Sequence, residues 1–302
     1  MRVVSNMIEP TPLIKISSKI YAKWELGNPS GSIKDRIAKY ILNHAEVNNL
    51  IKKGDQLIEA SSGNSGIAFS MLAAERGYIS NIVMPCDMSE ERKHILRLFG
   101  ANIIEIGEND FSGAIQLAEK LGKENNWFNP KQFSNPLNIE CHQKTTCQEV
   151  LHQVSELGLK VSCFLNGIGT GGTMMGIYKG FEDDFIKYKN NRILDVMPKF
   201  VAMEPRESAT LSGCVSGKHG IQGIGDGKAY LLDINILDDI IQISTKDAYS
   251  KMKQLMKENG LFVGVTSAAN ILAAERWIKK TNPEGVVITI LSDRAERYLS
   301  LL

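Results

Sequence analysis

Residues 161–173 read VSCFLNGIGTGGT and carry three signals of secondary structure in a row. Val161–Leu165 is a short apolar run of the kind that forms a buried strand. Asn166–Thr173 is a loop rich in glycine and threonine, and a helical pattern begins near Met174. A strand, a glycine loop and a helix in this order are typical of the α/β class, in which ligands bind where a strand ends and the next helix begins.

The same alternation of strand and helix runs through the rest of the chain. Apolar residues spaced three and four apart predict helices, and short apolar runs predict strands. The predicted strands are Gln56–Ala60, Asn81–Met84, Asn102–Ile106, Val161–Leu165, Phe200–Met203, Ile240–Ile243 and Val286–Leu291. The predicted helices are Arg36–Leu50, Asn64–Tyr78, Ser89–Phe99, Phe111–Asn125 and Lys246–Met256. Strands that alternate with helices of about 10–15 residues predict an α/β fold with mostly parallel twisted sheets flanked by helices.

The composition is that of an ordinary folded protein without a strong charge bias. The 302 residues are 43% hydrophobic and carry a formal net charge of +1, which provides no attraction to nucleic acid or to an anionic membrane. At about 150 residues per domain, the length predicts two domains or one large unit. No apolar run approaches the roughly 18 residues of a membrane helix, and the first residues lack the apolar core of a secretory signal. We therefore expect a cytoplasmic protein.

The five cysteines, at positions 86, 141, 147, 163 and 214, form no CxxC pair. An odd and scattered set predicts reduced thiols and not a disulfide framework or a zinc site. His142 lies between Cys141 and Cys147, which raises the possibility of a metal site. Because no second pair of ligands lies nearby, we expect no bound metal.

A second loop, residues 28–36, reads NPSGSIKDR and places Lys34 in the first turn of a helix. Pro29 and Gly31 predict a turn, and Ser32 is a candidate N-cap. A helix amino terminus disfavours a cation. Lys34 is therefore either a surface lysine whose long stem carries its charge into water, or a reactive amine that forms a Schiff base.

A third loop, residues 59–66, reads EASSGNSG and joins a predicted strand to a predicted helix. Small residues let the backbone approach a ligand, and the N–H groups at a helix start can bind a carboxylate. Serine, glycine and asparagine are also common in simple turns and caps. The loop alone is compatible with both interpretations.

The glycine loop after Val161–Leu165 also has two interpretations. The amides of Gly169–Thr173 and the hydroxyls of its two threonines predict a phosphate site. Gly167, Gly169 and Gly172 equally satisfy the G-x-G-x-x-G pattern of dinucleotide-binding proteins. However, no acidic strand end follows at the expected distance, and a nicotinamide site would leave the other two loops unexplained.

Together the three loops resemble the PLP-dependent cysteine synthase and cystathionine β-synthase family of fold type II, in its O-acetylserine sulfhydrylase-like form. Further matching segments follow the family order: TPLIKI at 11–16, QFSNP at 132–136, MEP at 203–205, QGIG at 222–225, GLFVGVTSAA at 260–269 and ERYLS at 296–300. The resemblance covers nearly the whole chain. It implies a larger PLP-binding domain of residues 1–34 and 139–302, and a smaller mobile domain of residues 35–138 that closes on the substrate.

The resemblance also implies a role for individual residues. Lys34 corresponds to the lysine that binds pyridoxal 5′-phosphate (PLP) covalently and then moves the Cα proton of the substrate. Asn64 corresponds to the group at the pyridine 3′-oxygen, and Thr266 to the hydroxyl at the pyridine nitrogen, although the adjacent Ser267 could replace it. The phosphate loop corresponds to Gly169, Thr170, Gly171, Gly172 and Thr173. The groups that hold the substrate carboxylate correspond to Ser61, Ser62, Ser65 and Gln132.

The implied reaction is β-replacement through an aminoacrylate, with O-acetylserine and sulfide giving cysteine and acetate. A hydroxyl at the pyridine nitrogen keeps the cofactor a weak electron sink, which favours loss of a group from Cβ over transamination. The resemblance further implies a homodimer and serine acetyltransferase as a candidate partner. A catalytically inactive homologue that only binds such a partner is a hypothesis of another class.

One position departs from the family pattern. Residues 223–227 read GIGDG, and Asp226 stands where relatives usually carry a small residue. Asp226 either turns to solvent or acts beside the substrate, as a general base that activates water or as a carboxylate that repels an anionic nucleophile. The second interpretation would make the protein a cysteine lyase that releases hydrogen sulfide and forms serine.

Overall fold

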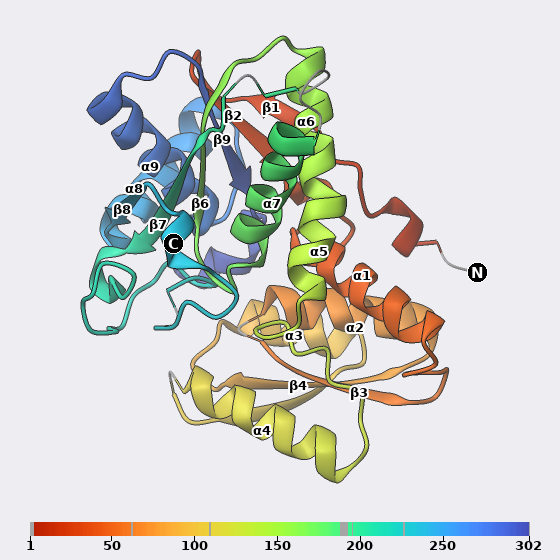
Figure 1. Ribbon diagram of the computed structural model, residues 1–302. Helices are drawn as coiled ribbons and strands as arrows, with labels where there is room; N and C mark the ends of the chain where they lie inside the picture. Colours follow the sequence, from red (N-terminus) through yellow and green to blue (C-terminus); the bar gives the residue numbers. More distant parts are fainter. Residues whose placement is uncertain are drawn as a thin grey trace. The chain divides into compact units, whose positions relative to one another are not determined.

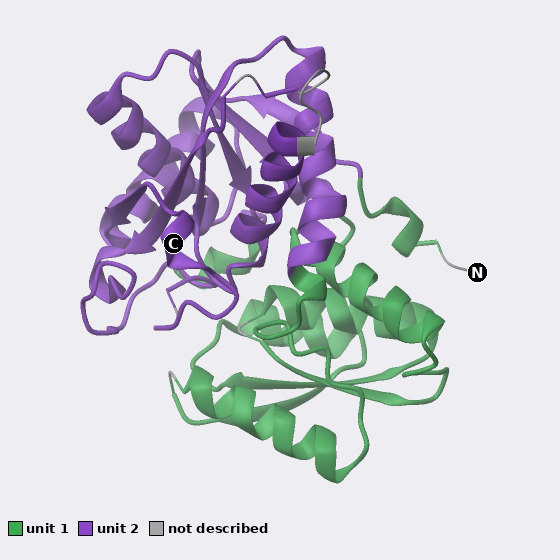
Figure 2. Ribbon diagram, viewed as in Figure 1, with its two compact units in different colours: residues 1–9, 28–138, 296–302 green, residues 10–27, 139–295 purple. Residues whose placement is uncertain are grey.

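The computed structural model describes residues 3–61, 63–108, 110–187, 193–194, 196–225 and 227–301. The chain divides into two compact units (Figure 2): unit 1 comprises residues 1–9, 28–138 and 296–302, and unit 2 comprises residues 10–27 and 139–295. The predicted domains share with these units the break after residue 138. Residues 1–9, 28–34 and 296–302, which the prediction assigned to the larger domain, group with the smaller unit. The predicted closing motion of residues 35–138 stays a prediction.

Unit 1 is built on a three-stranded parallel sheet in the order β3-β4-β5. Its strands are β3 (Gln56–Ala60), β4 (Ile79–Pro85) and β5 (Asn102–Ile106), and its helices are α1 (Lys34–Val47), α2 (Asn64–Arg76), α3 (Glu90–Leu98) and α4 (Phe111–Glu124). Helix α4 packs on one face of the sheet, where Ala114 and Ala118 belong to one apolar cluster with Val83. Helices α1, α2 and α3 lie on the other face (Figure 1), where α1 and α2 pack around Leu57 and α3 packs near Ile82.

Unit 2 is built on a six-stranded sheet in the order β1-β2-β9-β6-β7-β8, in which only β1 is antiparallel to its neighbour. The strands are β1 (Leu13–Lys15), β2 (Ile20–Trp24), β6 (Val161–Gly167), β7 (Lys199–Pro205), β8 (Asp239–Ile243) and β9 (Val286–Leu291). The helices are α6 (Thr146–Glu156), α7 (Gly172–Lys187), α8 (Thr245–Asn259) and α9 (Val265–Thr281). Helices α8 and α9 lie on one side of this sheet, and α6 and α7 lie on the other (Figure 1).

The break between the units falls within α5 (Leu137–Lys144). Short 3₁₀ helices complete the described structure: η1 (Ser5–Met7), η2 (Glu25–Gly27), η3 (Arg206–Ser208), η4 (Ile234–Ile236) and η5 (Ala295–Leu301). Side-chain caps fix the start of two α-helices: Asp110 accepts the N–H of Gly113 at 2.8 Å before α4, and Ser244 accepts the N–H of Asp247 at 3.1 Å before α8.

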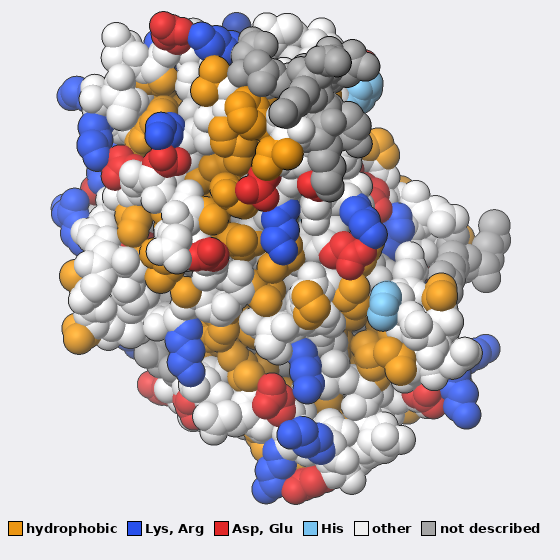
Figure 3. Space-filling view, in the orientation of Figure 1, with side chains coloured by type: hydrophobic (Ala, Val, Ile, Leu, Met, Phe, Trp, Pro, Cys, Tyr) orange, Lys and Arg blue, Asp and Glu red, His pale blue; other side chains and the backbone are white. Residues whose placement is uncertain are grey.

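The described surface mixes charges of both signs. On the face shown in Figure 3, basic and acidic side chains lie interspersed among polar and apolar ones. Within the described part of the chain, no helix is both long enough and apolar enough to cross a membrane.

Candidate functional site

Lys34 is the first residue of α1, within the first helical turn as predicted from the turn and cap residues, and two positions before the stretch predicted from apolar spacing. The residue at the N-cap position, directly before the helix, is Ile33, whose side chain cannot accept a hydrogen bond. The capping bond predicted for Ser32 is nevertheless present, since its Oγ accepts the N–H of Lys34 at 3.3 Å. Lys34 therefore lies at the junction of a tight turn and a well-packed helix, where small movements of the turn would move its side chain.

The turn that precedes Lys34 is closed by its own polar groups. The N–H of Gly31 donates to the carbonyl of Asn28 at 2.7 Å, and Gly31 has a φ of +82°, a conformation that favours glycine. Asp35, which is fully buried, accepts the N–H of Ser30 at 2.7 Å and also its hydroxyl. The turn is thus tied to the helix that it precedes.

The loop between β3 and α2 is organised by Ser61. Its Oγ accepts the N–H of Gly63 at 3.0 Å and the N–H of Gly66 at 2.8 Å, so that one hydroxyl holds both ends of the turn. Asn64 is the first residue of α2. Ser62, also predicted to bind the substrate carboxylate, lies outside the described residues.

Gln132 reaches this loop because the segment after α4 runs beside β3. The N–H of Ile58 donates to the carbonyl of Phe128 at 2.9 Å. The Gln132 amide then donates to the carbonyl of Ala60 at 2.9 Å and accepts the hydroxyl of Ser65 at 2.5 Å. The structure therefore brings three of the four predicted carboxylate groups together in unit 1, and all three are buried. They are Ser61, Ser65 and Gln132.

In unit 2, the predicted phosphate loop lies between the end of β6 and the start of α7. Gly171 has a φ of +84°, and a Cβ there would approach the backbone nitrogen of Leu232 to 2.6 Å. A Cβ on Gly169 would approach the carbonyl oxygen of Gly223 to 2.5 Å. The first N–H groups of a helix have no partner within it and attract anions. The neighbouring backbone therefore requires glycine at both positions, and the place of the loop at a helix start is compatible with a phosphate group.

His142 lies beside this loop, a position that sequence reasoning missed. Its Nε2 is 3.2 Å from the hydroxyl of Thr173, and its Nδ1 is 2.9 Å from the hydroxyl of Thr146. The imidazole thus orients the threonine that ends the phosphate loop. In the sequence, His142 was considered only as a metal ligand beside two cysteines, an interpretation that was not favoured.

Two hydroxyls at the start of α9 are candidates for the pyridine nitrogen. The hydroxyl of Thr266 donates to the carbonyl of Gln222 at 3.0 Å, so its proton is already used. The hydroxyl of Ser267 accepts the N–H of Ser292 at 2.8 Å and retains its own proton. The assignment of either group to the nitrogen stays a prediction.

Glu59, near the end of β3, is a buried carboxyl group for which sequence reasoning found no role. It accepts the N–H of Ala60 at 3.0 Å and the N–H of Gln132 at 3.2 Å. Burial raises the pKa of Glu59 to about 8, although both N–H donors and the positive charge of Lys34 oppose this rise. One feature of the sequence could have indicated a buried carboxyl group here, because Glu59 interrupts an apolar run that is expected to be buried.

This pKa predicts how stability depends on pH. In the unfolded chain Glu59 loses its proton near its ordinary pKa of 4.5, whereas the folded protein retains it up to about pH 8. The free energy of unfolding should therefore fall as pH rises between these values, by up to about 1.4 kcal/mol per pH unit from this group. In Glu59→Gln the fall should be shallower.

Urea unfolding at several pH values from about 5 to 8 measures this slope. The exposed Glu258→Gln is the matched control, because it removes a carboxylate that is already in water. Equal slopes in wild type and Glu59→Gln would show that Glu59 does not hold its proton in the folded state.

The described residues were also compared with the requirements of a metal site. No group of three or more His, Cys, Asp or Glu side chains among the described residues is placed to bind a metal. Burial also raises the pKa of the Cys147 thiol, which disfavours the thiolate that metals bind.

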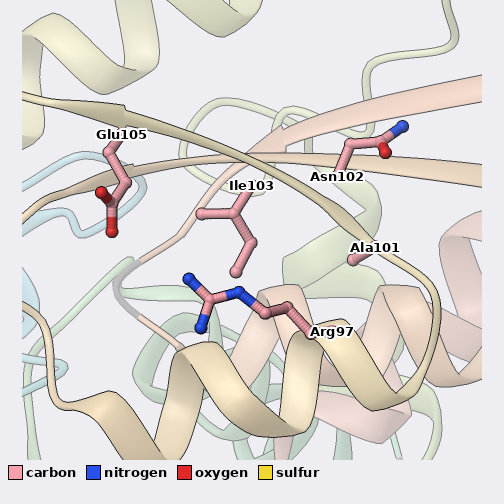
Figure 4. Close-up of a pocket in the computed structure, with 5 residues that line it drawn as sticks. All are labelled: Arg97, Ala101, Asn102, Ile103 and Glu105. Atoms are coloured by element: carbon pink, nitrogen blue, oxygen red, sulfur yellow. The ribbon is translucent and has the colours of Figure 1, made fainter.

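A shallow pocket of unit 1 lies between α3 and β5. It is lined by Arg97, Ala101, Asn102, Ile103 and Glu105, and Arg97 extends from α3 toward Ile103 (Figure 4). This lining includes no described residue of the predicted site.

Comparison with known proteins identifies the family. Residues 4–293 match the family described as pyridoxal-phosphate dependent enzyme. The chain belongs to this family. A cysteine synthase from Staphylococcus aureus (strain Mu50 / ATCC 700699) is 37% identical over 306 residues, covering 98% of this chain and 95% of that protein. A probable cysteine synthase from Bacillus subtilis (strain 168) is 36% identical over 313 residues, covering 99% and 97%.

Solved structures agree with these matches. A hydrogen sulfide-producing enzyme from Fusobacterium nucleatum superimposes with a TM-score of 0.89 at 37% identity, covering 98% of this chain and 89% of that one. An O-acetylserine dependent cystathionine β-synthase from Helicobacter pylori superimposes with a TM-score of 0.87 at 32% identity, covering 99% and 97%. The predicted family, the fold type II architecture and PLP as cofactor are confirmed. The dinucleotide interpretation of the glycine loop is set aside.

Proposed function

We propose that this PLP enzyme is cysteine synthase-like and replaces the acetate group of O-acetylserine by sulfide to form cysteine. Similarity to cysteine synthases over 98% of the chain is the observation that carries this proposal. Two structural features support it. Lys34 begins α1 behind a closed turn, and the glycine loop begins α7.

The cofactor would be held by Lys34, Asn64 and the glycine loop. The amine of Lys34 would bind its aldehyde carbon and later move the substrate Cα proton. The N–H groups of Gly169–Thr173 would hold its phosphate, and Asn64 would contact its 3′-oxygen. When bound, PLP withdraws electrons from Cα of the amino acid, so that a group can leave Cβ and a nucleophile can add there.

The substrate carboxylate would be held in unit 1. The hydroxyls of Ser61 and Ser65 and the amide of Gln132 lie together at the start of α2, where the helix dipole favours an anion. Ser62 is assigned to the same group from the sequence alone. A carboxylate fixed at this point would orient Cα toward the Lys34 amine and exclude water from that side of the substrate.

The phosphate assignment predicts the effect of a side chain at Gly171. Gly171→Val places a branched side chain at a positive φ and against the backbone of Leu232. The loop can relieve such strain, which is worth about 1–3 kcal/mol, by leaving its phosphate-binding conformation, so that PLP should be retained roughly 10–100-fold less tightly. The measurement is the PLP content after extended dialysis, from visible absorbance.

Gly158→Val is the matched control for this variant. Gly158 also has a positive φ, of +59°, but a Cβ on this residue would have no atom within 4 Å. The control should retain PLP as wild type does. If Gly171→Val also retains PLP fully, the phosphate lies elsewhere.

The reaction itself is tested by its products. Purified enzyme with O-acetylserine and sulfide should form cysteine and acetate in equal amounts, and neither should form without enzyme. Absence of cysteine from this mixture, with turnover of another amino acid instead, would overturn the proposal.

A second candidate function is the release of hydrogen sulfide from cysteine with formation of serine. Asp226 favours it, because a carboxylate near Cβ could activate water and repel hydrosulfide. Similarity to a hydrogen sulfide-producing enzyme also supports it. Asp226 lies outside the described residues, so its role rests on the sequence.

Three further assignments rest on the family resemblance. We propose a homodimer, serine acetyltransferase as a candidate partner, and a cytoplasmic location. We also propose that residues 35–138 close on the substrate, since closure would exclude water and competing nucleophiles.

A further inference from the structure

The last described residues of the chain return to unit 1 and pack against its catalytic elements. Residues 296–302 group with unit 1, although more than 150 residues of unit 2 precede them. Residues 296–301 lie in η5, where Arg297 and Tyr298 are almost completely buried. A buried arginine needs acceptors for its charge and its N–H groups, so its partners show what the segment does.

The guanidinium of Arg297 is bound to the turn that carries Lys34. Its Nη1 donates to the carbonyl of Gly31 at 3.3 Å, and its Nη2 donates to the carbonyl of Ser30. These two residues lie three and four positions before Lys34. The same turn is tied on its other side to Asp35. One planar, rigid donor therefore fixes two successive carbonyls of the turn.

The rest of η5 is bound to α3. The hydroxyl of Ser89 donates to the Arg297 carbonyl at 3.1 Å, and the N–H of Ser300 donates to the carboxylate of Glu91 at 2.7 Å. These contacts hold the backbone of η5 in place, so that the Arg297 side chain starts from a fixed point.

Tyr298 extends the connection to the substrate loop. The Arg92 guanidinium carbon lies 4.8 Å from the centre of the Tyr298 ring, a cation–π contact between buried groups. The Arg92 side chain in turn packs on Gly63, where a Cβ would approach its Cδ to 2.2 Å. The segment therefore contacts the Lys34 turn directly and the Ser61–Gly66 loop through Arg92.

We infer that Arg297 is a positioning residue that acts through the Ser30–Gly31 turn to hold Lys34 in its reactive place. This inference rests on the proposed role of Lys34. Loss of the guanidinium would leave the turn held by its bonds to Asp35 and Asn28 but not by those to Arg297, and would let the Lys34 amine depart from its reactive geometry. The groups that hold the substrate carboxylate are bonded independently of Arg297, so substrate binding would change little.

The test compares Arg297→Met with Arg294→Met. Arg294 belongs to the same carboxyl-terminal region and donates to a carbonyl, that of Leu26, but in unit 2. Arg297→Met should lose about 100-fold in kcat, the cost expected for an Å-scale misplacement, with KM within about 3-fold of wild type. Arg294→Met should remain within about 3-fold of wild type in both constants.

A second measurement does not depend on which amino acid is the substrate. Apoenzyme prepared from each variant is mixed with PLP, and the rate at which the Lys34-linked absorbance appears is recorded. Arg297→Met should recombine at least about 10-fold more slowly than wild type, and Arg294→Met should not. Normal recombination and kcat in Arg297→Met, or equal losses in Arg294→Met, would overturn the inference.

If Arg297→Met does not fold, Arg297→Lys tests the positioning role of Arg297 instead. It keeps the charge and one donor but not the two-pronged geometry, so it should fold and still recombine more slowly than wild type. Wild-type recombination and kcat in Arg297→Lys would overturn the inference. If wild type recombines normally but makes no cysteine, the proposed reaction fails while the inference about Lys34 stands.

Discussion

Lys34→Ala should yield a folded protein that lacks the visible absorbance of linked PLP and has lost about 10²–10⁴-fold of its turnover. The reason is positional: Lys34 begins α1 behind a turn fixed by Asp35 and Arg297, and its amine is assigned both covalent binding and proton transfer. Visible spectra and steady-state rates of the purified variant measure both losses. Because alanine is a good helix former, the fold should survive the substitution.

Lys39→Ala on the same helix is the matched control. Lys39 pairs with Glu9 at 3.0 Å, so its loss removes a lysine and an ion pair without touching the turn. It should keep its absorbance and its rate within a few-fold of wild type. Unchanged absorbance and turnover in Lys34→Ala would remove the central residue of the account.

Asp226→Asn should lose about 10²–10⁴-fold in the rate of serine formation from cysteine, if Asp226 activates water. Asparagine keeps the size and polarity of the side chain but cannot accept the proton. The Asp226 carboxylate and hydrosulfide are both anions, which repel each other strongly in a closed site of low dielectric. The variant should therefore admit hydrosulfide more readily and gain cysteine synthase activity. PLP binding should be intact. The assay incubates each enzyme with cysteine alone and quantifies serine, sulfide and pyruvate.

Asp233→Asn provides the control in the same region, since Asp233 is exposed and its carboxylate accepts the N–H of Asn235 at 3.0 Å. It should leave the products of every assay unchanged. If wild type forms no serine, or Asp226→Asn forms it at the wild-type rate, Asp226 has no catalytic part and the cysteine synthase activity stands alone.

Local sequence patterns predicted most of the strands and helices that surround the site, but not α5, α6 and α9. Each predicted strand and helix has a counterpart, because apolar periodicity reports which face of an element is buried. Apolar spacing alone began the first helix at Arg36, because Lys34 and Asp35 are charged and break the pattern, whereas the turn and cap residues placed Lys34 in its first turn, as in the structure. Fully buried Asp35 is stabilised by Ser30, a contact that periodicity cannot show.

The two missed strands, β1 and β2, differ from the missed helices in that β2 depends on a contact between distant residues. Strands β1 and β2 are short, and β2 is defined by its parallel pairing with β9, more than 260 residues later. Sequence position gives no signal of such a pairing. The six-stranded order of unit 2 could not be derived for the same reason.

In the site, too, local sequence features could be predicted and contacts between distant residues could not. The loops at Lys34, Ser61 and Gly169 were visible in the sequence as clusters of small residues at helix starts. The contact of Ser65 with Gln132 joins residues 67 positions apart, and the contact of Arg297 with Ser30 joins residues 267 positions apart. The family resemblance assigned Ser65 and Gln132 to one group of residues without predicting their contact, and the contact of Arg297 with Ser30 was not predicted.

The most direct test of the account is the position of the cofactor on the chain. Purified holoenzyme is treated with borohydride, which makes the lysine–PLP bond permanent, and is then digested and analysed by peptide mass spectrometry. The account predicts that the pyridoxyl group is found on Lys34, and that it is absent when substrate amino acid has displaced the lysine before reduction. A pyridoxyl group on any other lysine, with Lys34 unmodified, would contradict it.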